Sequence, residues 1–206
     1  MYKRQGHDWG GATAWRAALD YPDSVERAII FSNPHPINYA RAYHEVDKHR
    51  ELLDAYIPAA RADEAPWNRE GSTADNFAHF KESVYTEQAQ DKMRWSLALG
   101  LEDTWSMDDG RSLDALYNHY KALSWPLPAL PGCTAIPGLD FAAYQPILVL
   151  YGEQDRFLAG EAYRLPNDDC APNAKYVKYN DGDHWIHHTH KLNAMWQMKR
   201  FLRKTR

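Results

Sequence analysis

A short glycine-rich segment near the N-terminus has the form of a nucleophile elbow. Residues 6–11 read Gly-His-Asp-Trp-Gly-Gly, which fits the pattern Gly-x-nucleophile-x-Gly with Asp8 at the reactive position. Such a turn strains the backbone, so the neighbouring residues must lack side chains that would clash. A helix starting behind the turn would favour the negative charge of Asp8. A carboxylate there can attack saturated carbon bearing a strained or good leaving group, and water must then hydrolyse the resulting ester.

Two further residues complete a catalytic set in chain order. Asp155 follows the apolar run 146–151, and His184 follows the strand-like residues 174–179. Nucleophile, acid and histidine in this order, each just past a strand, form the pattern of a nucleophilic triad. The histidine would take a proton from water, while the acid would fix its tautomer and stabilise the imidazolium.

Each of these residues also has a plainer interpretation. Asp8 could cap the helix that follows it, and Asp155 could be a loop aspartate, with Glu153 as a competitor for its role. His184 is one of ten histidines, and its spacing to His188 admits a metal site. The glutamate of the zinc-protease motif is absent from that spacing, so we expect neither a metal nor a cofactor.

The elements around these residues follow an alternating pattern. Residues 12–21 place apolar side chains at helical spacing, and residues 28–31 form a short apolar run typical of a buried parallel strand. Strands are expected again at 146–151 and 174–179, with a helix between them. Residues 188–202 carry apolar residues near one face of a last helix. This order predicts an α/β layer with a mostly parallel sheet.

A helical insertion separates the two halves of this layer. Residues 37–129 place Leu, Ala, Tyr and Trp at helical intervals and contain no convincing strand. The stretch 121–138 is rich in proline, which suits a boundary loop.

Taken together, these motifs resemble the epoxide-hydrolase branch of the α/β-hydrolase family. The resemblance covers nearly all of the chain from Gly6 onward and rests on residues 6–11, the Asn-Pro-His-Pro segment 33–36, residues 151–155 and the pair His184–Trp185. It implies a partial α/β-hydrolase core, formed by residues 1–36 and 138–206. Residues 37–137 would form an inserted helical cap.

The resemblance also implies that two cap tyrosines protonate the epoxide oxygen as the ring opens. An alkoxide is a poor leaving group at neutral pH, so a phenol donor lowers the barrier. Residues 118–121, Asn-His-Tyr-Lys, are similar to the family's Asn-Trp-Tyr-Arg, which makes Tyr120 the first choice. Tyr56 lies where the family's early cap tyrosine falls. Other candidates are Tyr43, Tyr85 and Tyr117. The backbone N–H of Trp9 would bind the oxyanion of ester hydrolysis.

The expected reaction is therefore the opening of a small hydrophobic epoxide to a vicinal diol through an ester on Asp8. A haloalkane dehalogenase is the nearest alternative, because it resembles this chain in its Asp nucleophile followed by Trp. The motif around Tyr120 favours the epoxide, since an alkoxide needs an acid and a halide does not. A non-catalytic remnant of a hydrolase is the third interpretation.

The bulk composition and the N-terminal residues limit what kind of protein this chain can be. Hydrophobic residues make up 44% and charged residues 25% of the 206 residues, as in ordinary globular proteins, and the net charge of −4 gives no reason to expect a nucleic-acid partner. No apolar run is long enough for a membrane span. Cys133 and Cys170 are too few for a disulfide framework, so we expect a reducing, cytoplasmic location. Residues 1–5 are polar and show no strand pattern, which predicts a truncated fragment whose first residues form no strand.

Overall fold

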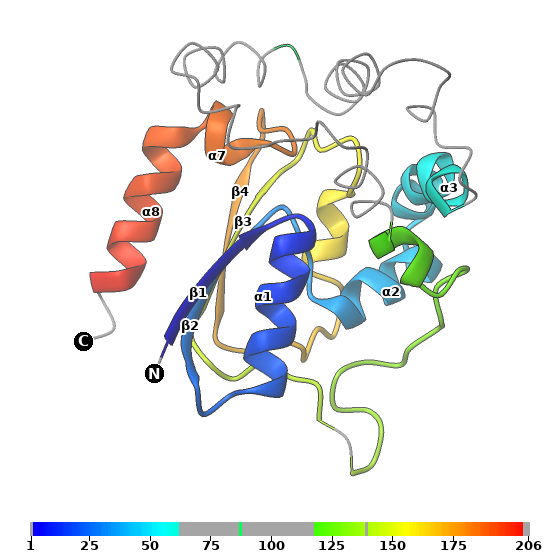
Figure 1. Cartoon of the computed structure of the whole chain (residues 1–206), viewed down its shortest axis with the longest axis horizontal. Coiled ribbons are helices and arrows are strands. Elements are labelled where there is room, and N and C mark those ends of the chain that lie inside the picture. The colour runs from blue at the N-terminus through cyan, green and yellow to red at the C-terminus, as the bar shows by residue number, and fades with distance from the viewer. Residues whose placement is uncertain (1, 62–86, 88–117, 139, 204–206) are drawn as a thin grey trace. The chain divides into compact units, whose positions relative to one another are not determined.

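The computed structural model describes residues 2–61, 87, 118–138 and 140–203 (Figure 1). Contacts within the chain divide it into two compact units. The first unit comprises Met1–Leu53 and Leu127–Arg206, and the second comprises Asp54–Pro126. The core and cap boundaries expected from the sequence stay a prediction.

Four parallel strands form the centre of the first unit (Figure 1). They lie side by side in chain order: β1 (Tyr2–His7), β2 (Val25–Phe31), β3 (Ile147–Gly152) and β4 (Ala174–Tyr179). The register places Phe31 between His7 of β1 and Leu150 of β3. Because all strands are parallel, their carboxyl ends meet at one edge of the sheet.

The two central strands are buried along almost their whole length. Every residue of β3 is buried, and β2 shows one partly exposed position in seven. A parallel sheet must be covered on both faces, so its inner strands are apolar without alternation. The strands predicted at residues 28–31, 146–151 and 174–179 are confirmed.

Helices cover both faces of this sheet. α1 (Trp9–Asp20) buries Trp15, and its Gly11 lies against Ile30 of β2. α8 (Lys191–Arg203) packs instead on the opposite face, against a cluster that includes Ile29 and Phe31 of the same strand. Side chains alternate between the faces of a strand, so α1 and α8 lie on opposite sides (Figure 1). The helices expected over residues 12–21 and 188–202 are confirmed, the second preceded by the short α7 (Ile186–Thr189).

The prediction that the first residues form no strand is wrong. Tyr2–His7 pairs with β2 as strand β1, despite a polar sequence. Strand pairing uses backbone groups, and Arg4 and Gln5 are exposed. Polar and charged side chains are common where a strand lies at the edge of a sheet, as β1 does among the described residues.

A second difference lies between β3 and β4. The helix expected there is a single 3-10 turn, Gly160–Tyr163, and the remaining residues form turns and loops. Two of these residues, Phe157 and Leu158, donate their backbone N–H groups to Oδ1 of Asp155.

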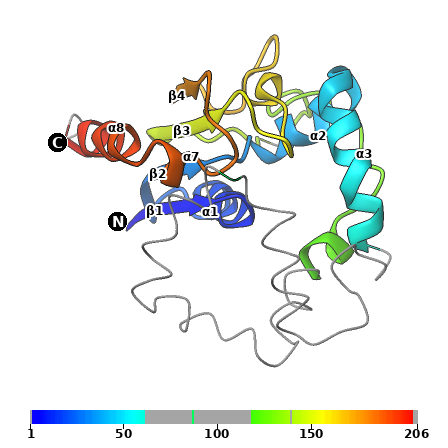
Figure 2. The ribbon, with the colours of Figure 1, turned by 90° about the horizontal axis from the view of Figure 1, so that it is seen from above.

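Two helices follow β2 (Figure 2). α2 (Pro36–Glu45) begins at His35, whose Nδ1 accepts a hydrogen bond from the N–H of Ile37 at 3.2 Å. α3 (Asp47–Arg61) comes next, and residues 118–122 are also helical. No helix in the described ranges is long and apolar enough to cross a membrane.

The two cysteines are not free thiols in the structure. Cys133 and Cys170 are joined by a disulfide, and both are fully buried. Their spacing of 37 residues in the chain gave no sign of pairing, because the contact depends on two loops that only the fold brings together.

Two glycines at the elbow differ in what their positions require, and this difference gives a first prediction. A Cβ on Gly6 would overlap the backbone carbonyl of Gly10, whereas a Cβ on Gly10 would meet no described atom within 4 Å. We expect Gly6→Ala to lower the free energy of unfolding by about 1–3 kcal/mol or more. Gly10→Ala should leave it unchanged or raise it by up to about 1 kcal/mol. Urea unfolding of both variants measures the difference, and equal losses would contradict this account of the turn.

Two buried histidines give a second prediction, on pH. Burial lowers the pKa of His35 and of His49 to about 4 each, so both are neutral in the folded chain. In the unfolded chain they take up protons near their ordinary value of 6.5, so stability is full above that pH and falls as the pH drops towards 4. Replacing His49, which accepts a hydrogen bond from the N–H of Ala159, by Gln should reduce this loss. Unfolding midpoints at pH 7, 6 and 5 test it, and an unchanged pH slope in His49→Gln would refute it.

Candidate active site

Asp8 lies at the turn between β1 and α1. It follows the last residue of β1 directly, and its backbone adopts a left-handed conformation with φ of 51°. The turn is fixed by two backbone hydrogen bonds, from the N–H of Asp8 to Phe31 (3.1 Å) and from Ala12 to the carbonyl of Asp8 (3.0 Å). The Asp8 side chain makes no capping hydrogen bond to α1. The capping role considered for Asp8 from the sequence is therefore not observed.

His184 lies between the two aspartates named from the sequence. Its Nδ1 donates to Oδ2 of Asp155 at 2.7 Å, and its Nε2 lies 3.4 Å from Oδ1 of Asp8. The side chains of Asp155 and His184 are buried, whereas that of Asp8 is 37% exposed. Of the three side chains, that of Asp8 is thus the most exposed.

The loops after β3 and β4 are packed backbone against backbone, which brings Asp155 to His184. A Cβ on Gly152 would overlap the carbonyl oxygens of Gly182 and Asp183, so only glycine permits this approach. The N–H of Gln154 also donates to the carbonyl of Gly182 at 2.8 Å.

Asp155 serves two partners with its two oxygens. Oδ1 accepts the backbone N–H groups of Phe157 (2.8 Å) and Leu158 (3.1 Å), while Oδ2 accepts from His184. The loop role weighed from the sequence and the contact with the histidine therefore occur together. Glu153, its competitor, pairs with Lys178 at 3.2 Å instead.

The ionisation of His184 and that of Asp8 depend on each other. Burial opposes protonation of His184, but the charges of Asp155 and Asp8 and their hydrogen bonds raise its pKa to about 10. Burial opposes ionisation of Asp8, but the hydrogen bond and charge of His184 hold the pKa of that carboxyl below its usual value. The backbone N–H of Trp9 acts in the same direction. The folded chain thus favours an ionised Asp8 beside an imidazolium.

The two tyrosines named from the sequence lie together within the second unit. The rings of Tyr56, on α3, and Tyr120 have centroids 6.0 Å apart and are perpendicular. Arg61 donates to the carbonyl of Tyr120 at 3.0 Å, which ties the two segments. Among the alternatives, Tyr43 is buried in α2 of the first unit. Tyr85 and Tyr117 lie outside the described residues.

Two contacts of His184 were not anticipated from the sequence. Its backbone carbonyl accepts hydrogen bonds from Nε2 of His7 (2.9 Å) and from Oγ of Ser32 (2.8 Å). Their positions, at the end of β1 and directly after β2, were the signal that could have identified them, because parallel strands end at the same edge.

Among the described residues, two groups of potential metal ligands lie outside the site around His184. One group is His35, Cys133 and Cys170, and another is Asp168, Asp169 and Cys170. Cys133 and Cys170 are joined in the disulfide, so neither offers a thiolate. Neither group includes a residue of the site around His184.

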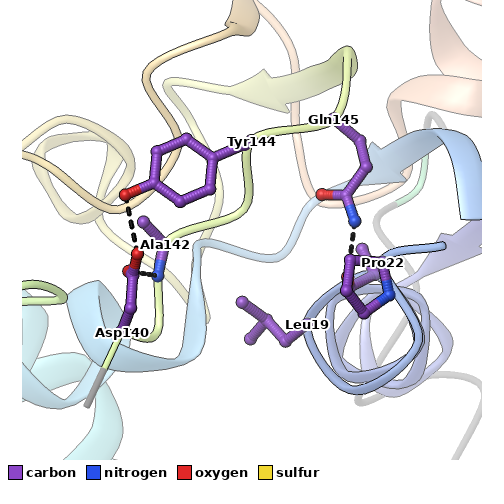
Figure 3. A pocket seen from close by; sticks show the side chains of 7 residues that line it. Leu19, Pro22, Asp140, Ala142, Tyr144 and Gln145 are labelled. Carbon is purple, nitrogen blue, oxygen red and sulfur yellow. Dashed lines mark hydrogen bonds between the residues drawn. The ribbon is translucent and has the colours of Figure 1, made fainter. Parts of the chain in front are cut away.

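A surface hollow of about 450 Å³ lies at the far end of α1 from Asp8 (Figure 3). Leu19 and Pro22 line it from the end of that helix, and Asp140, Tyr144 and Gln145 line it from the segment before β3. A helix of this length spans about 18 Å, so the hollow is remote from the elbow. It is not the pocket of the site around His184.

Comparison with known proteins identifies the family of the chain. A family model described as alpha/beta hydrolase fold matches residues 5–191. The chain is 25% identical over 188 residues to AB hydrolase superfamily protein YfhM of Bacillus subtilis, covering 89% of this chain and 59% of that protein. It is 23% identical to mouse epoxide hydrolase 4, covering 88% of this chain and 48% of that protein.

A solved structure shows the same fold. The crystal structure of Bacillus megaterium epoxide hydrolase in complex with an inhibitor superposes with a TM-score of 0.73 at 20% identity, over 96% of this chain and 68% of that one. The chain spans roughly half of the length of the curated relatives it matches. With the family model matching most of its length, the chain belongs to the α/β-hydrolase fold family.

Proposed function

We propose that this chain contributes the nucleophile, acid and histidine of an epoxide hydrolase acting on a small hydrophobic epoxide. The observation that supports this most strongly is the position of His184, 3.4 Å from Asp8 and 2.7 Å from Asp155. The residue at the elbow is an aspartate, so the covalent intermediate is an ester of the protein carboxyl rather than an acylated serine. Relatives named as epoxide hydrolases support the substrate class.

In the first step the carboxylate of Asp8 attacks an epoxide carbon. A C–O bond forms to Asp8, and the ring C–O bond breaks with its electron pair left on oxygen. That oxygen takes the proton of a phenol, for which Tyr56 and Tyr120 are the proposed donors. The proposed cap, residues 37–137, includes both tyrosines.

Before the second step the imidazolium of His184 gives up its proton, and the phenolate takes one back through solvent. The neutral His184 then activates water. Its Nε2 takes one proton as the water oxygen adds to the ester carbonyl carbon, and the N–H of Trp9 donates to the developing oxyanion. Collapse breaks the bond between the carbonyl carbon and the ester oxygen. The ester oxygen takes the second proton of the added water and the diol leaves. Asp8 is again a carboxylate, now with one oxygen from water, beside the imidazolium of His184.

The charges favour this order of events. While Asp8 is ionised, it and Asp155 hold the pKa of His184 near 10, so the imidazole is protonated and cannot act as a base. Ester formation removes the charge of Asp8 and its hydrogen bond. The pKa of His184 then falls, and the neutral imidazole needed by the second step becomes accessible only after the first.

A trapping experiment tests the covalent step. His184→Gln should still form the ester on Asp8 but hydrolyse it at least about 100-fold more slowly, because water loses its base. Incubation of this variant with styrene oxide, followed by peptide mass spectrometry, should show the added mass on Asp8. In the unsubstituted chain, single turnover in heavy-oxygen water should place the label in the Asp8 carboxylate. Asp8→Asn is the control for nonspecific alkylation, and equal modification of that variant contradicts the mechanism.

The tyrosines distinguish an epoxide from a halide substrate. Tyr120→Phe should slow alkylation by styrene oxide by about 100-fold, since the alkoxide loses a proton donor. Alkylation by 1-bromobutane needs no acid and should change little. Diol and bromide release are measured separately, with Tyr43→Phe as a control in a tyrosine of the other unit. Faster turnover of 1-bromobutane than of styrene oxide would instead support a haloalkane dehalogenase.

A further inference from the structure

His184 lies in a loop, yet its backbone is held firmly in place. The loop between β4 and α7 belongs to no helix or strand, so regular backbone pairing does not fix it. The backbone carbonyl oxygen of His184 accepts two side-chain hydrogen bonds, from Nε2 of His7 at 2.9 Å and from Oγ of Ser32 at 2.8 Å. A carbonyl has two lone pairs, so these donors satisfy it completely.

Both donors are positioned by the sheet. His7 is the last residue of β1 and pairs with Phe31, and Ser32 follows Phe31 directly. The N–H of Ser32 donates to the carbonyl of Leu150 in β3 at 2.9 Å, and Ser32 is fully buried with φ of 46°. A left-handed serine is uncommon, and its strain is sustained here by contacts on all sides. The two donors therefore have fixed places at the edge where Asp8 lies.

His7 is suited to donate without adding charge. Burial, followed by the charge of His184, lowers the pKa of His7 to about 3, so the ring is neutral and its single proton lies on Nε2. The rings of His7 and His184 are 4.7 Å apart at 62°. A cation at His7 would disfavour protonation of His184, which the proposed second step requires.

We propose that His7 and Ser32 are positioning residues that jointly hold the His184 backbone so that the imidazole spans Asp8 and Asp155. The spectroscopic part of this proposal concerns the folded chain alone, and its kinetic part rests on the proposed epoxide hydrolysis. Displacing a reacting group by about 1 Å costs up to about 100-fold in rate, so two anchors on one carbonyl have a measurable consequence.

The primary test follows the Nδ1 proton of His184 by NMR. In the unsubstituted chain this proton, donated to Asp155, should give a far-downfield resonance that exchanges slowly. His7→Phe with Ser32→Ala removes both donors while keeping an aromatic ring at residue 7, and we expect the resonance to move upfield and exchange faster. In a chain that keeps Ser32, His7→Gln retains a side-chain N–H at residue 7. Its Nδ1 resonance should match that of the unsubstituted chain. Thr189→Val removes a hydroxyl that donates to Asp183 in the same loop, and it should leave the resonance unchanged.

The kinetic test separates positioning from folding. With styrene oxide, the doubly substituted chain should hydrolyse the Asp8 ester between roughly ten- and a hundredfold more slowly, with alkylation changed less. Circular dichroism identifies a variant that has unfolded, and the single substitutions then replace it.

The outcomes for the two proposals are distinct. A folded double variant whose Nδ1 resonance and ester hydrolysis match those of the unsubstituted chain overturns the positioning role and leaves the proposed function standing. If the unsubstituted chain forms no ester but the resonance responds as expected, the positioning stands and the proposed function fails.

Discussion

The buried ion pair of His184 and Asp155 is the interaction on which the candidate site depends. A charge buried without a partner costs several kcal/mol, so an imidazolium at this depth requires a carboxylate in contact with it. Asp155 can provide that contact only because the loop backbones after β3 and β4 touch at Gly152. The imidazolium of His184 can therefore be buried only where these two loops meet. Its ion pair with Asp155 in turn holds the loops together.

The parallel sheet converts distant positions in the chain into neighbours. Asp8, Asp155 and His184 are separated by up to 176 positions, yet each follows a strand whose carboxyl end lies at the same edge. The same geometry brings His7 and Ser32 to the carbonyl of His184. One structural rule thus supplies both the reactive groups and the contacts that orient them.

Prediction from the sequence succeeded where side-chain pattern determines structure. The apolar runs of β2 and β3 are buried strands, and the order of Asp8, Asp155 and His184 led to residues that the fold brings together. It failed for β1, whose pairing depends on backbone groups that polar side chains do not obstruct. The disulfide and the left-handed Ser32 also have no local pattern, because each depends on segments that meet only in the folded chain.

Among His7, His184 and His187, the positive charge is confined to His184. His7 packs against His187 with ring centroids 4.3 Å apart, and burial lowers the pKa of His187 to about 2. Among the described residues neither ring has a carboxylate partner as close as the two that flank His184, so burial has the larger effect on the pKa of each. The charge of His184 lowers the pKa of each further. Three neighbouring imidazoles of the same chemical type therefore differ in protonation because two carboxylates are arranged around only one of them. That asymmetry follows from the placement of Asp8 and Asp155, and of these three imidazoles it makes His184 the protonated one beside the carboxylate of Asp8.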